Sequence, residues 1–340
     1  MQRVRTSHPV SCQSLYALLS FFLVLASLSG VARAAEPKKL NGFDLTACTI
    51  PAEDIQRGGP PRDGIPALTD PKTMATEEAS YLAPDDMVIG VEVDGEARAY
   101  PLRILLWHEN VNDTLGGKAI AVTYCPLCHS AIVFDREVEG EVREFGISGL
   151  LWNSNVLLYD RRDDGKSSLW SQAAMRAVCG PAARKGLKLR LLSSQLLSWK
   201  KWKNRYSDTT VLSRKTGHRR DYGHNPYENY FSTQRLMFPV SASAEDLADY
   251  PNKEQVVVVR IGDRIKGYPM SEIAEAAGAD GIVTDTLSGV KVRLHYDPTE
   301  KTVRVSPAGR VPGGKAFGIA HMFWFAWKSV YPDAPIFRAR

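Results

Sequence analysis

Two cysteines and a histidine lie within five consecutive residues of the sequence, in the stretch Thr-Tyr-Cys-Pro-Leu-Cys-His-Ser that begins at Thr123. Three chemistries use such a spacing: a dithiol/disulfide couple formed by Cys125 and Cys128, a metal knuckle, and covalent haem attachment through Cys-x-x-Cys-His. Haem attachment fits poorly, because the apolar runs on both sides, 119–124 and 131–134, predict strands and place the motif in a turn between them. The redox and metal interpretations stay open at this point.

The first 34 residues have the pattern of a secretory signal peptide. Arg3 and Arg5 precede an apolar core from Leu15 to Leu28, Ala-Arg-Ala ends the segment at Ala34, and the segment contains no acidic residue. The apolar core is shorter than the roughly 20 residues that a membrane span needs. We therefore expect an exported protein, periplasmic or extracellular, with no stable membrane span after cleavage.

Cleavage after Ala34 changes both the charge and the number of cysteines. The formal net charge of +5 falls to 5 − 3 = +2, because three arginines leave with the segment and no acidic residue does. A net charge this small predicts neither nucleic-acid binding nor binding to a membrane surface. Four cysteines remain, and in an oxidising compartment they are candidates for structural disulfides. Cys48 and Cys179 permit a long-range bridge without requiring one.

Two stretches of the chain share an ordered pattern of residues. The two stretches begin at Val88 and at Val256. Each predicts a strand, a tight turn and a second strand that ends in Tyr-Pro. A helical segment, the tripeptide Asp-Thr-Leu and another predicted strand follow in both. A Trp-x-x-Trp-x-x-x-Tyr-x-Asp block follows in each, from Trp199 and from Trp324. We interpret the pattern as an internal duplication in a β-rich α+β protein. The expected organisation is a signal peptide 1–34, a loop-rich segment 35–87, a first copy 88–250 with the Cys-x-x-Cys site, and a second, degenerate copy 251–340.

The first copy contains residues that the second lacks. Cys125-Pro126 in the first copy corresponds to Asp297-Pro298 in the second, so the fold does not need the thiols. From this point to the Trp block, the first copy is longer by about 47 residues. Polar residues crowd this insert, which suits a site better than a core. The candidate substrate-binding residues are Ser130, Ser148, Asn153, Trp170 and Gln172.

Several motifs together resemble a family of exported bacterial and archaeal proteins of unknown function: Tyr100-Pro101, Trp107-His-Glu109, Asn112-Asp-Thr114, Tyr124-Cys-Pro-Leu-Cys128, Ser148-Gly-Leu150, Tyr159-Asp-Arg161, Ser168-Leu-Trp-Ser-Gln172 and Arg220-Asp-Tyr222. The resemblance covers nearly the whole chain after the signal peptide. Some members of that family are described as selenoproteins, with selenocysteine in the Cys-Pro-x-Cys box. The resemblance therefore implies that Cys125 and Cys128 are a redox pair. The residue after the second cysteine varies in the family, which implies no obligatory role for His129.

We therefore expect a thiol-redox protein, an oxidoreductase whose catalytic residues are Cys125 and Cys128, helped by His108 or His129 as proton donor or thiolate partner. It would use no cofactor and would act on an unknown redox partner or small-molecule substrate. The N-terminal Cys125 is expected to attack and Cys128 to resolve. At least two of five side chains are expected near a sulfur: His108, Ser148, Asn153, Trp170 and Gln172.

The alternative is a metal-binding or metal-handling protein that uses the same sequence motif. Tetrahedral zinc, or a softer metal such as copper, needs ligands besides two thiolates, and no second Cys-x-x-Cys exists in the sequence. The ligands would then be Cys125, Cys128, His108, His129 and His321.

Overall fold

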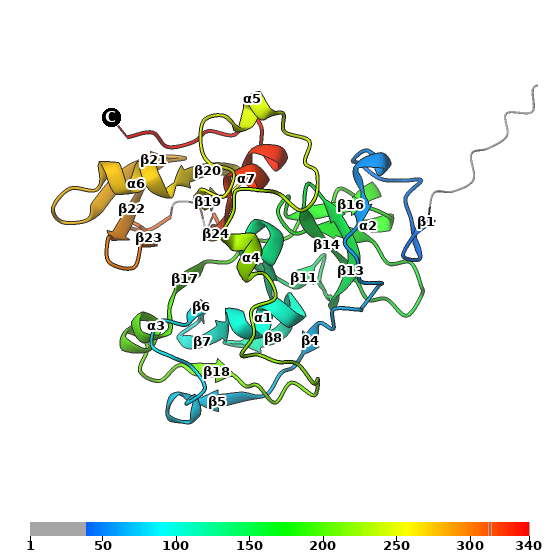
Figure 1. Ribbon diagram of the computed structural model, residues 1–340, viewed down its shortest axis with the longest axis horizontal. Coiled ribbons are helices and arrows are strands. Elements are labelled where there is room, and N and C mark those ends of the chain that lie inside the picture. The colour runs from blue at the N-terminus through cyan, green and yellow to red at the C-terminus, as the bar shows by residue number, and fades with distance from the viewer. Residues whose placement is uncertain (1–38, 312, 314, 340) are drawn as a thin grey trace, which may run out of the picture. The chain divides into compact units, whose positions relative to one another are not determined.

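The computed structural model describes residues 39–311, 313 and 315–339, so the expected signal peptide 1–34 lies outside the described residues. Strands make up 41% of the structure and helices 17%, which confirms the β-rich α+β class. Residues 39–339 belong to one compact unit (Figure 1). Among these residues, no helix has both the length and the apolar character that crossing a bilayer requires.

A seven-stranded sheet holds the segment with the two thiols. In spatial order its strands are β20 (Arg264–Pro269), β19 (Gln255–Ile261), β24 (Phe317–Phe323), β10 (Ser130–Asp135), β9 (Lys118–Cys125), β8 (Asn110–Leu115) and β4 (Leu68–Thr69). Strands β9 and β10 are antiparallel neighbours, and Cys125 pairs with Ser130 at the end of their ladder. The Cys-Pro-Leu-Cys stretch therefore forms the connection between two buried strands, as the apolar runs on either side predict.

Two five-stranded sheets adjoin the seven-stranded one. The first has the order β17 (Ser194–Ser198), β6 (Met87–Val93), β7 (Glu96–Pro101), β18 (Thr210–Leu212) and β5 (Thr73–Ala75). The second has the order β16 (Arg176–Cys179), β15 (Leu169–Ser171), β14 (Asn155–Asp160), β13 (Phe145–Trp152) and β3 (Gln56–Arg57). Four strands of this second sheet come from the insert between β10 and β17, and we call it the insert sheet.

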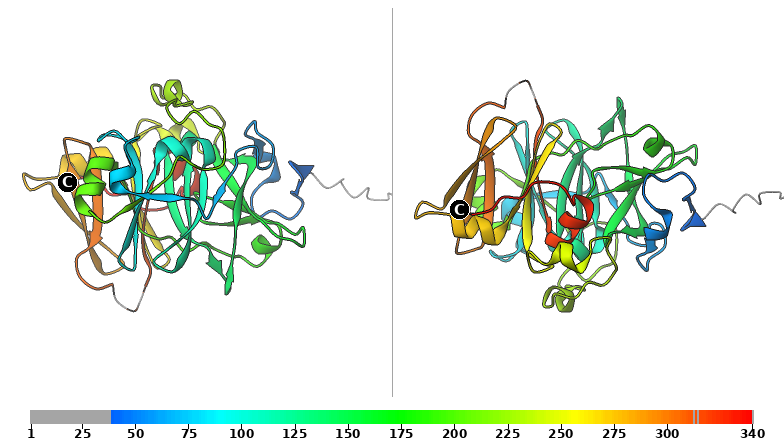
Figure 2. Two further views of the ribbon diagram at one scale, coloured as in Figure 1. Left: turned by 90° about the horizontal axis from the view of Figure 1, so that it is seen from below. Right: turned by 90° about the horizontal axis from the view of Figure 1, so that it is seen from above.

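The remaining elements are shorter or lie at the periphery. The small sheets are β21 (Ile282–Leu287) with β22 (Val290–Asp297) and β23 (Thr302–Pro307), β1 (Lys39–Leu40) with β2 (Phe43–Asp44), and β11 (Glu137–Val138) with β12 (Glu141–Val142). The helices are α1 (Leu102–His108), α2 (Pro181–Arg184), α3 (Trp199–Arg205), α4 (Glu228–Phe231), α5 (Ala244–Leu247), α6 (Met270–Ala276) and α7 (Trp324–Val330). Figures 1 and 2 place the β21–β23 sheet and the insert sheet on opposite sides of β19 and β24.

The two stretches that share a sequence pattern also share an order of elements. Strands β6 and β7, helix α1 and strands β8 and β9 correspond to β19, β20, α6, β21 and β22. Val88 pairs with Pro101 in the first hairpin, and Val256 pairs with Pro269 in the second. The sheet partners differ, because β8 and β9 join the seven-stranded sheet whereas β21 and β22 form a sheet of their own with β23. A common origin of the two stretches stays a prediction.

The tryptophan blocks pack in the same way in both stretches. Trp202 on α3 lies against Gly90, where an added Cβ would come 2.2 Å from the ring, and Trp327 on α7 lies against Gly267, where the corresponding distance is 2.8 Å. Both tryptophans are fully buried. The helices can approach these strands only because glycine leaves room for the indole rings.

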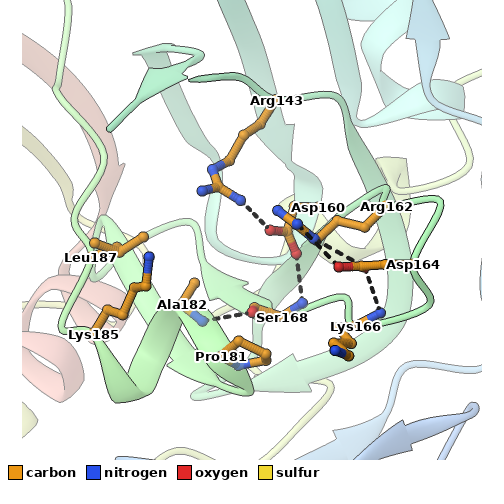
Figure 3. Close-up of a pocket in the computed structure, with 10 residues that line it drawn as sticks. All are labelled: Arg143, Asp160, Arg162, Asp164, Lys166, Ser168, Pro181, Ala182, Lys185 and Leu187. Atoms are coloured by element: carbon orange, nitrogen blue, oxygen red, sulfur yellow. Dashed lines mark hydrogen bonds and ion pairs between the residues drawn. The ribbon is translucent and has the colours of Figure 1, made fainter. Parts of the chain in front are cut away.

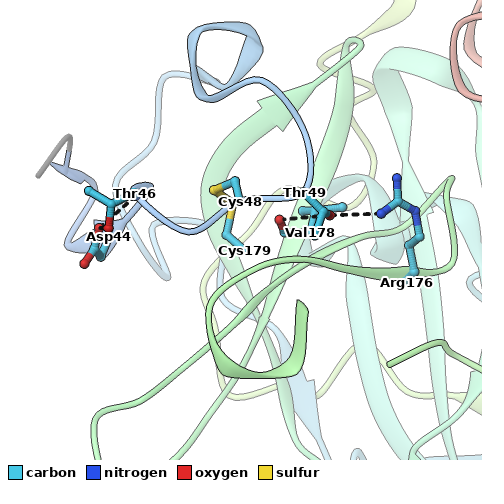
Figure 4. Close-up of a disulfide and its surroundings, with 7 residues drawn as sticks. All are labelled: Asp44, Thr46, Cys48, Thr49, Arg176, Val178 and Cys179. Atoms are coloured by element: carbon cyan, nitrogen blue, oxygen red, sulfur yellow. Dashed lines mark hydrogen bonds between the residues drawn. A yellow bond between two sulfur atoms is a disulfide. The ribbon is translucent and has the colours of Figure 1, made fainter. Parts of the chain in front are cut away.

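A disulfide between Cys48 and Cys179 ties the N-terminal segment to the edge of the insert sheet (Figure 4). The Cα atoms lie 4.0 Å apart, and the bond spans 131 residues of sequence. Beside it, the Thr49 amide donates to Val178 O at 2.8 Å, and Arg176 donates to Thr49 Oγ1 at 3.0 Å. The long-range bridge that the sequence permits is therefore present, and in the described part of the chain Cys125 and Cys128 remain as free thiols.

Candidate functional site

The two free thiols of the described residues flank and end a single turn of 3-10 helix, Pro126–Cys128, between β9 and β10: Cys125 is the N-cap residue and Cys128 the last residue of the turn. Pro126 occupies the first position of this turn, where its missing N–H costs no hydrogen bond. His129 ends the turn in the left-handed conformation, with φ 47°. The turn brings the two sulfurs close enough to share a hydrogen bond. Both side chains are buried, with 1% of Cys125 and 0% of Cys128 exposed.

Polar groups converge on one of the two sulfurs. Asn155 Nδ2 donates to Cys128 Sγ at 3.0 Å, and Ser130 Oγ lies 3.2 Å from the same atom. Cys125 Sγ has weaker polar contacts: Ser154 O lies 4.0 Å away, and the Val156 backbone supplies a hydrogen bond that only slightly offsets burial. The surroundings of the two cysteines are therefore unequal.

Gln172 fixes the orientation of both groups that contact Cys128. Its Oε1 accepts from Ser130 Oγ at 2.6 Å and from Asn155 Nδ2 at 2.7 Å. Its Nε2 donates to Thr123 Oγ1 at 2.8 Å and to Ser130 O at 3.1 Å. The backbone amide of Ala173 in turn donates to Asn155 Oδ1 at 2.9 Å, which leaves the Asn155 amide free to donate. The insert thus supplies two amide side chains to the thiol site: Asn155 at the start of β14 and Gln172 directly after β15.

The Ser130 hydroxyl can serve Cys128 in either protonation state. When the sulfur carries a proton, the thiol donates to Ser130 Oγ and the hydroxyl donates to Gln172 Oε1. When the sulfur is a thiolate, the same hydroxyl can turn and donate to it, while Asn155 still supplies Gln172 Oε1. Loss of the thiol proton therefore leaves no polar group of this network without a partner.

These contacts separate the pKa values of the two cysteines. Burial raises the pKa of Cys128, but hydrogen bonds from Cys125, Ser130 and Asn155 outweigh it, so that its pKa lies below the ordinary value. Burial raises the pKa of Cys125, and its hydrogen bond to Cys128 and the charge of Cys128 raise it further. The hydrogen bonds favour the thiolate at Cys128 rather than at Cys125. The order of the two cysteines in the sequence led us to expect attack by Cys125, and the roles of the two stay a prediction.

Glu109 is a buried carboxyl that sequence analysis did not single out as a site residue. It follows α1 in the left-handed conformation, with φ 55°, and its backbone oxygen accepts from the Tyr124 amide at 2.8 Å. Only 6% of it is exposed, and among the described residues its carboxyl group has no hydrogen-bond partner. Burial, with a smaller contribution from the charge of Cys128, raises the pKa of Glu109 to about 8. The signal available in the sequence is an acidic residue between a strongly apolar segment and a strand.

The three histidines proposed for the site have different surroundings. His129 Nδ1 lies 2.7 Å from Tyr124 Oη, and its ring stacks on Phe323 at 5.1 Å. His321 is buried, and its Nε2 has no partner among the described residues. Burial lowers the pKa of each to about 4, so both are neutral at pH 7. His108 is bonded instead to Pro66 O at 2.7 Å and to Tyr222 Oη at 2.8 Å.

The side chains proposed as metal ligands do not form a metal site in the described part of the chain. No group of three or more His, Cys, Asp or Glu side chains there has a suitable arrangement. Both ring nitrogens of His108 are hydrogen-bonded, and His129 Nδ1 is bonded to Tyr124. Metal binding by Cys125, Cys128 and these histidines therefore stays a prediction.

The proposed substrate-binding residues are divided between the thiol site and the scaffold. Ser130 contacts Cys128, Gln172 is one hydrogen bond removed from it, and Trp170 lies in the same apolar cluster as both cysteines. Ser148 donates to Leu157 O and accepts from the Leu150 amide, and so stabilises β13. Asn153 bonds Ser329 O and the Ser241 amide. Asn155, two residues further on, is the asparagine that reaches the sulfur.

Three aromatic side chains near the thiol turn, Tyr124, His129 and Phe231, line a cavity of about 310 Å³, and we call these three the aromatic cover. We call the cavity itself the aromatic cavity; its walls include Leu102, Leu106, Tyr124, His129, Tyr222 and Phe231. Helix α4 supplies Phe231 and is held to the thiol turn, because Tyr230 Oη donates to Leu127 O at 2.6 Å. Tyr124 and His129, whose side chains are hydrogen-bonded to each other, therefore line the cavity and are the immediate sequence neighbours of Cys125 and Cys128.

A second cavity, of about 230 Å³, lies between the insert sheet and α2 (Figure 3). A buried ion pair joins Arg143 to Asp160 at 2.8 Å on its wall, and the Ser168 hydroxyl accepts from the Ala182 amide at 2.9 Å. Arg161, the neighbour of Asp160 in sequence, pairs instead with Asp63 and Glu144. These contacts explain the Tyr-Asp-Arg and Ser-Leu-Trp-Ser motifs as scaffold of the insert sheet.

Residues 62–334 match the model of a family described as a protein of unknown function (DUF3179). No curated protein and no solved structure matches the chain. The matched range includes the thiol turn, the whole insert sheet except β3, and the second of the two related stretches.

Proposed function

Because the chain belongs to the DUF3179 family, for which no function is described, we propose from the geometry of its site that it is an exported thiol-redox protein that uses Cys125 and Cys128 as a dithiol/disulfide couple. The observation that supports this most is the set of hydrogen bonds at Cys128 Sγ. Asn155 and Ser130, oriented by Gln172, stabilise a thiolate inside the apolar core. A disulfide with a purely structural role needs no such donors.

The proposed reaction is thiol–disulfide exchange in two steps. The Cys128 thiolate attacks one sulfur of a disulfide R–S–S–R′, the S–S bond breaks, and R′S⁻ leaves and takes up a proton. Cys125 then loses its proton and attacks Cys128 Sγ, so that the Cys125–Cys128 disulfide forms and RSH is released. The sum is two protein thiols and one disulfide converted to one protein disulfide and two small thiols, and the couple can run in either direction.

Glu109 is suited to move the proton of this exchange. Its carboxyl is buried beside the thiols and has a pKa of about 8, so it can both hold and release a proton near neutral pH. Neither His129 nor His321 is suited to the same role, because burial lowers the pKa of each to about 4. We assign the acid–base role to Glu109 in place of the histidines.

The burial of both sulfurs restricts what can react with them. A folded protein partner cannot reach side chains that are 1% and 0% exposed without displacing the aromatic cover. A small disulfide or thiol that enters the aromatic cavity needs only a movement of the Tyr124 and His129 side chains. We therefore propose a small-molecule substrate.

The second of the two related stretches has no thiol pair. Its Asp297, at the position of Cys125, pairs with Lys201 on α3. The shared order of elements and the equal hairpin register support an internal duplication in which only the first copy has a redox site.

The experiment that tests the function traps the first intermediate. The Cys125→Ser and Cys128→Ser variants are treated with bis(2-hydroxyethyl) disulfide and analysed by mass spectrometry, with the double variant as control for Cys48 and Cys179. We expect a mixed disulfide at Cys128 in Cys125→Ser, much less adduct in Cys128→Ser, and an internal disulfide in the wild type. Wild-type protein that forms no Cys125–Cys128 disulfide and holds metal that each single variant loses would refute the proposal in favour of metal handling.

A further inference from the structure

The segment after β18 is strongly basic. Five of the seven residues from Arg214 to Arg220 are arginine, lysine or histidine, and all five of these basic residues are exposed. They line a cleft of about 710 Å³, which we call the basic cleft; its basic residues are Arg214, Lys215, His218, Arg219 and Arg220. The proposed redox reaction makes no use of this cleft.

The positive charges of the basic cleft are not neutralised within the described part of the chain. None of its arginines or its lysine takes part in an ion pair there. The two acidic residues on its wall accept from backbone amides instead: Glu78 from Ala75 at 3.0 Å and Asp221 from Gly223 at 3.0 Å. Unpaired cations gathered on one wall attract an anionic group.

Buried hydrogen bonds hold the basic segment in place. His108 Nδ1 must donate to Pro66 O, so the neutral ring accepts at Nε2 from the Tyr222 hydroxyl, 2.8 Å away. The Thr216 hydroxyl then donates to Tyr222 Oη, at 2.6 Å. Tyr222 is only 8% exposed. His108 thus fixes a phenol that anchors both ends of the 216–222 loop, and the cations occupy a fixed wall.

The basic cleft adjoins the aromatic cavity. Tyr222 and Gly223 line both the basic cleft and the aromatic cavity. The aromatic cavity ends at Tyr124 and His129, which adjoin Cys125 and Cys128. A molecule held in the cleft by a charged group can therefore extend its other end toward the dithiol.

We propose that the basic cleft binds the anionic group of the small disulfide or thiol whose sulfur reacts with Cys128. This inference rests on the proposed thiol-redox function for the reaction, but the binding site itself is independent of it. Carboxylate and phosphate are the two sources of negative charge that arginine recognises best. The ligand class is an organosulfur compound with such a group a few bonds from its sulfur.

The test of the site uses a ligand that cannot react. Thiodipropionate has two carboxylates and a thioether, and thiodiglycol is its neutral analogue. We expect calorimetry at low ionic strength to detect binding of thiodipropionate but not of thiodiglycol to the wild-type protein. Arg219→Gln/Arg220→Gln should weaken this binding by about tenfold or more, because two charge-assisted contacts are lost.

Two controls make the result specific. Lys200→Gln/Lys203→Gln removes the same charge from exposed positions on α3 and should leave binding unchanged. Competition by inorganic phosphate, set against competition by acetate, distinguishes a phosphate-preferring from a carboxylate-preferring cleft. Equal affinity in the two double variants, or no saturable binding to the wild type, would overturn the proposal.

A rate measurement separates this proposal from the proposed function. Oxidation of Cys125 and Cys128 by dithiodipropionate should slow in Arg219→Gln/Arg220→Gln, whereas oxidation by bis(2-hydroxyethyl) disulfide should not. If thiodipropionate binds as expected but neither disulfide oxidises the wild type, the redox function fails and the anion site stands. If the neutral disulfide oxidises the dithiol but thiodipropionate does not bind, the function stands and the anion site fails.

Discussion

Replacement of Glu109 by glutamine should make the protein more stable than the wild type at pH 8, whereas the two proteins should differ little near pH 5. The amide has the shape of the protonated carboxyl, so it fills the same space without a charge that has to be buried. The expected difference follows from the pKa of about 8 in the folded protein, against an ordinary value of 4.5.

Between these two pKa values, the folded protein holds a proton on Glu109 that the unfolded chain has lost. The free energy of unfolding therefore decreases as pH rises through this range, by about 1.4 kcal/mol for each pH unit. The accumulated loss is roughly 3 kcal/mol at pH 7 and about 5 kcal/mol above pH 8. Glutamine removes this loss, and the gain is large beside a typical total stability of about 5–15 kcal/mol.

The measurement is urea denaturation of wild type and Glu109→Gln from pH 5 to pH 8, followed by tryptophan fluorescence, with Cys125 and Cys128 kept as thiols. The difference between the two proteins cancels contributions that they share, such as those of the buried histidines. Glu77→Gln, at an exposed position, is the matched control and should show no change in this difference with pH. A stability difference between wild type and Glu109→Gln that stays constant from pH 5 to pH 8 would refute the reasoning.

Three further predictions concern single contacts. Asn155→Ala removes a donor 3.0 Å from Cys128 Sγ and should raise the pKa for alkylation of this thiol by iodoacetamide by about 1–2 units, whereas Asn153→Ala should not; an unchanged profile would exclude Asn155 as a thiolate donor. Cys48→Ser/Cys179→Ser opens a loop of 131 residues and should lower the free energy of unfolding by up to about 5 kcal/mol in urea denaturation, while reactivity of the other two thiols persists. Gly90→Ala places a methyl group 2.2 Å from Trp202 and should destabilise by at least about 1–3 kcal/mol, whereas Gly278→Ala, whose nearest atom would be 3.6 Å away, should be tolerated; equal midpoints would contradict the packing argument.

The parts of the fold that depend on local pattern could be predicted from the sequence. The β6–β7 hairpin is an example, because Asp94 and Gly95 both take positive φ, as a two-residue hairpin turn requires. The turn between β9 and β10 is another, since apolar runs flank it and Pro126 lies inside it. The sequence pattern could not predict which sheet each hairpin joins, because β8–β9 and β21–β22 have similar sequence patterns but pair with different strands.

The cysteines of the site could be predicted, but most of the groups around them could not. Strand alternation alone does not select Asn155 over Asn153, because the β13 ladder shifts register between Ile147 and Leu150. The turn that follows has two consecutive residues with positive φ, Asn153 and Ser154, which reset the direction of the next strand. Only Asn155 then points to Cys128.

At the end of α1, the backbone conformation likewise determines which of two adjacent polar residues lies near the thiols. Sequence analysis proposed His108, which the helix directs to Pro66 and Tyr222. Glu109 follows in a left-handed conformation, which turns its side chain away from the helical course and toward the thiols. The left-handed conformation of Glu109, which no sequence pattern specified, thus places Glu109 rather than His108 near the thiols.

The Cys48–Cys179 disulfide also poses a problem of order during folding. In the unfolded chain Cys125 is nearer to Cys48 than Cys179 is, at 125 − 48 = 77 residues against 131, and the shorter loop costs about 0.5 kcal/mol less to close. The entropy of loop closure alone therefore favours a Cys48–Cys125 bond over the Cys48–Cys179 bond of the folded protein. Cys125 and Cys128 are separated by only two residues and can pair with each other fastest of all. If they form the proposed Cys125–Cys128 bond first, neither thiol is open to Cys48 before the insert sheet brings Cys179 into position.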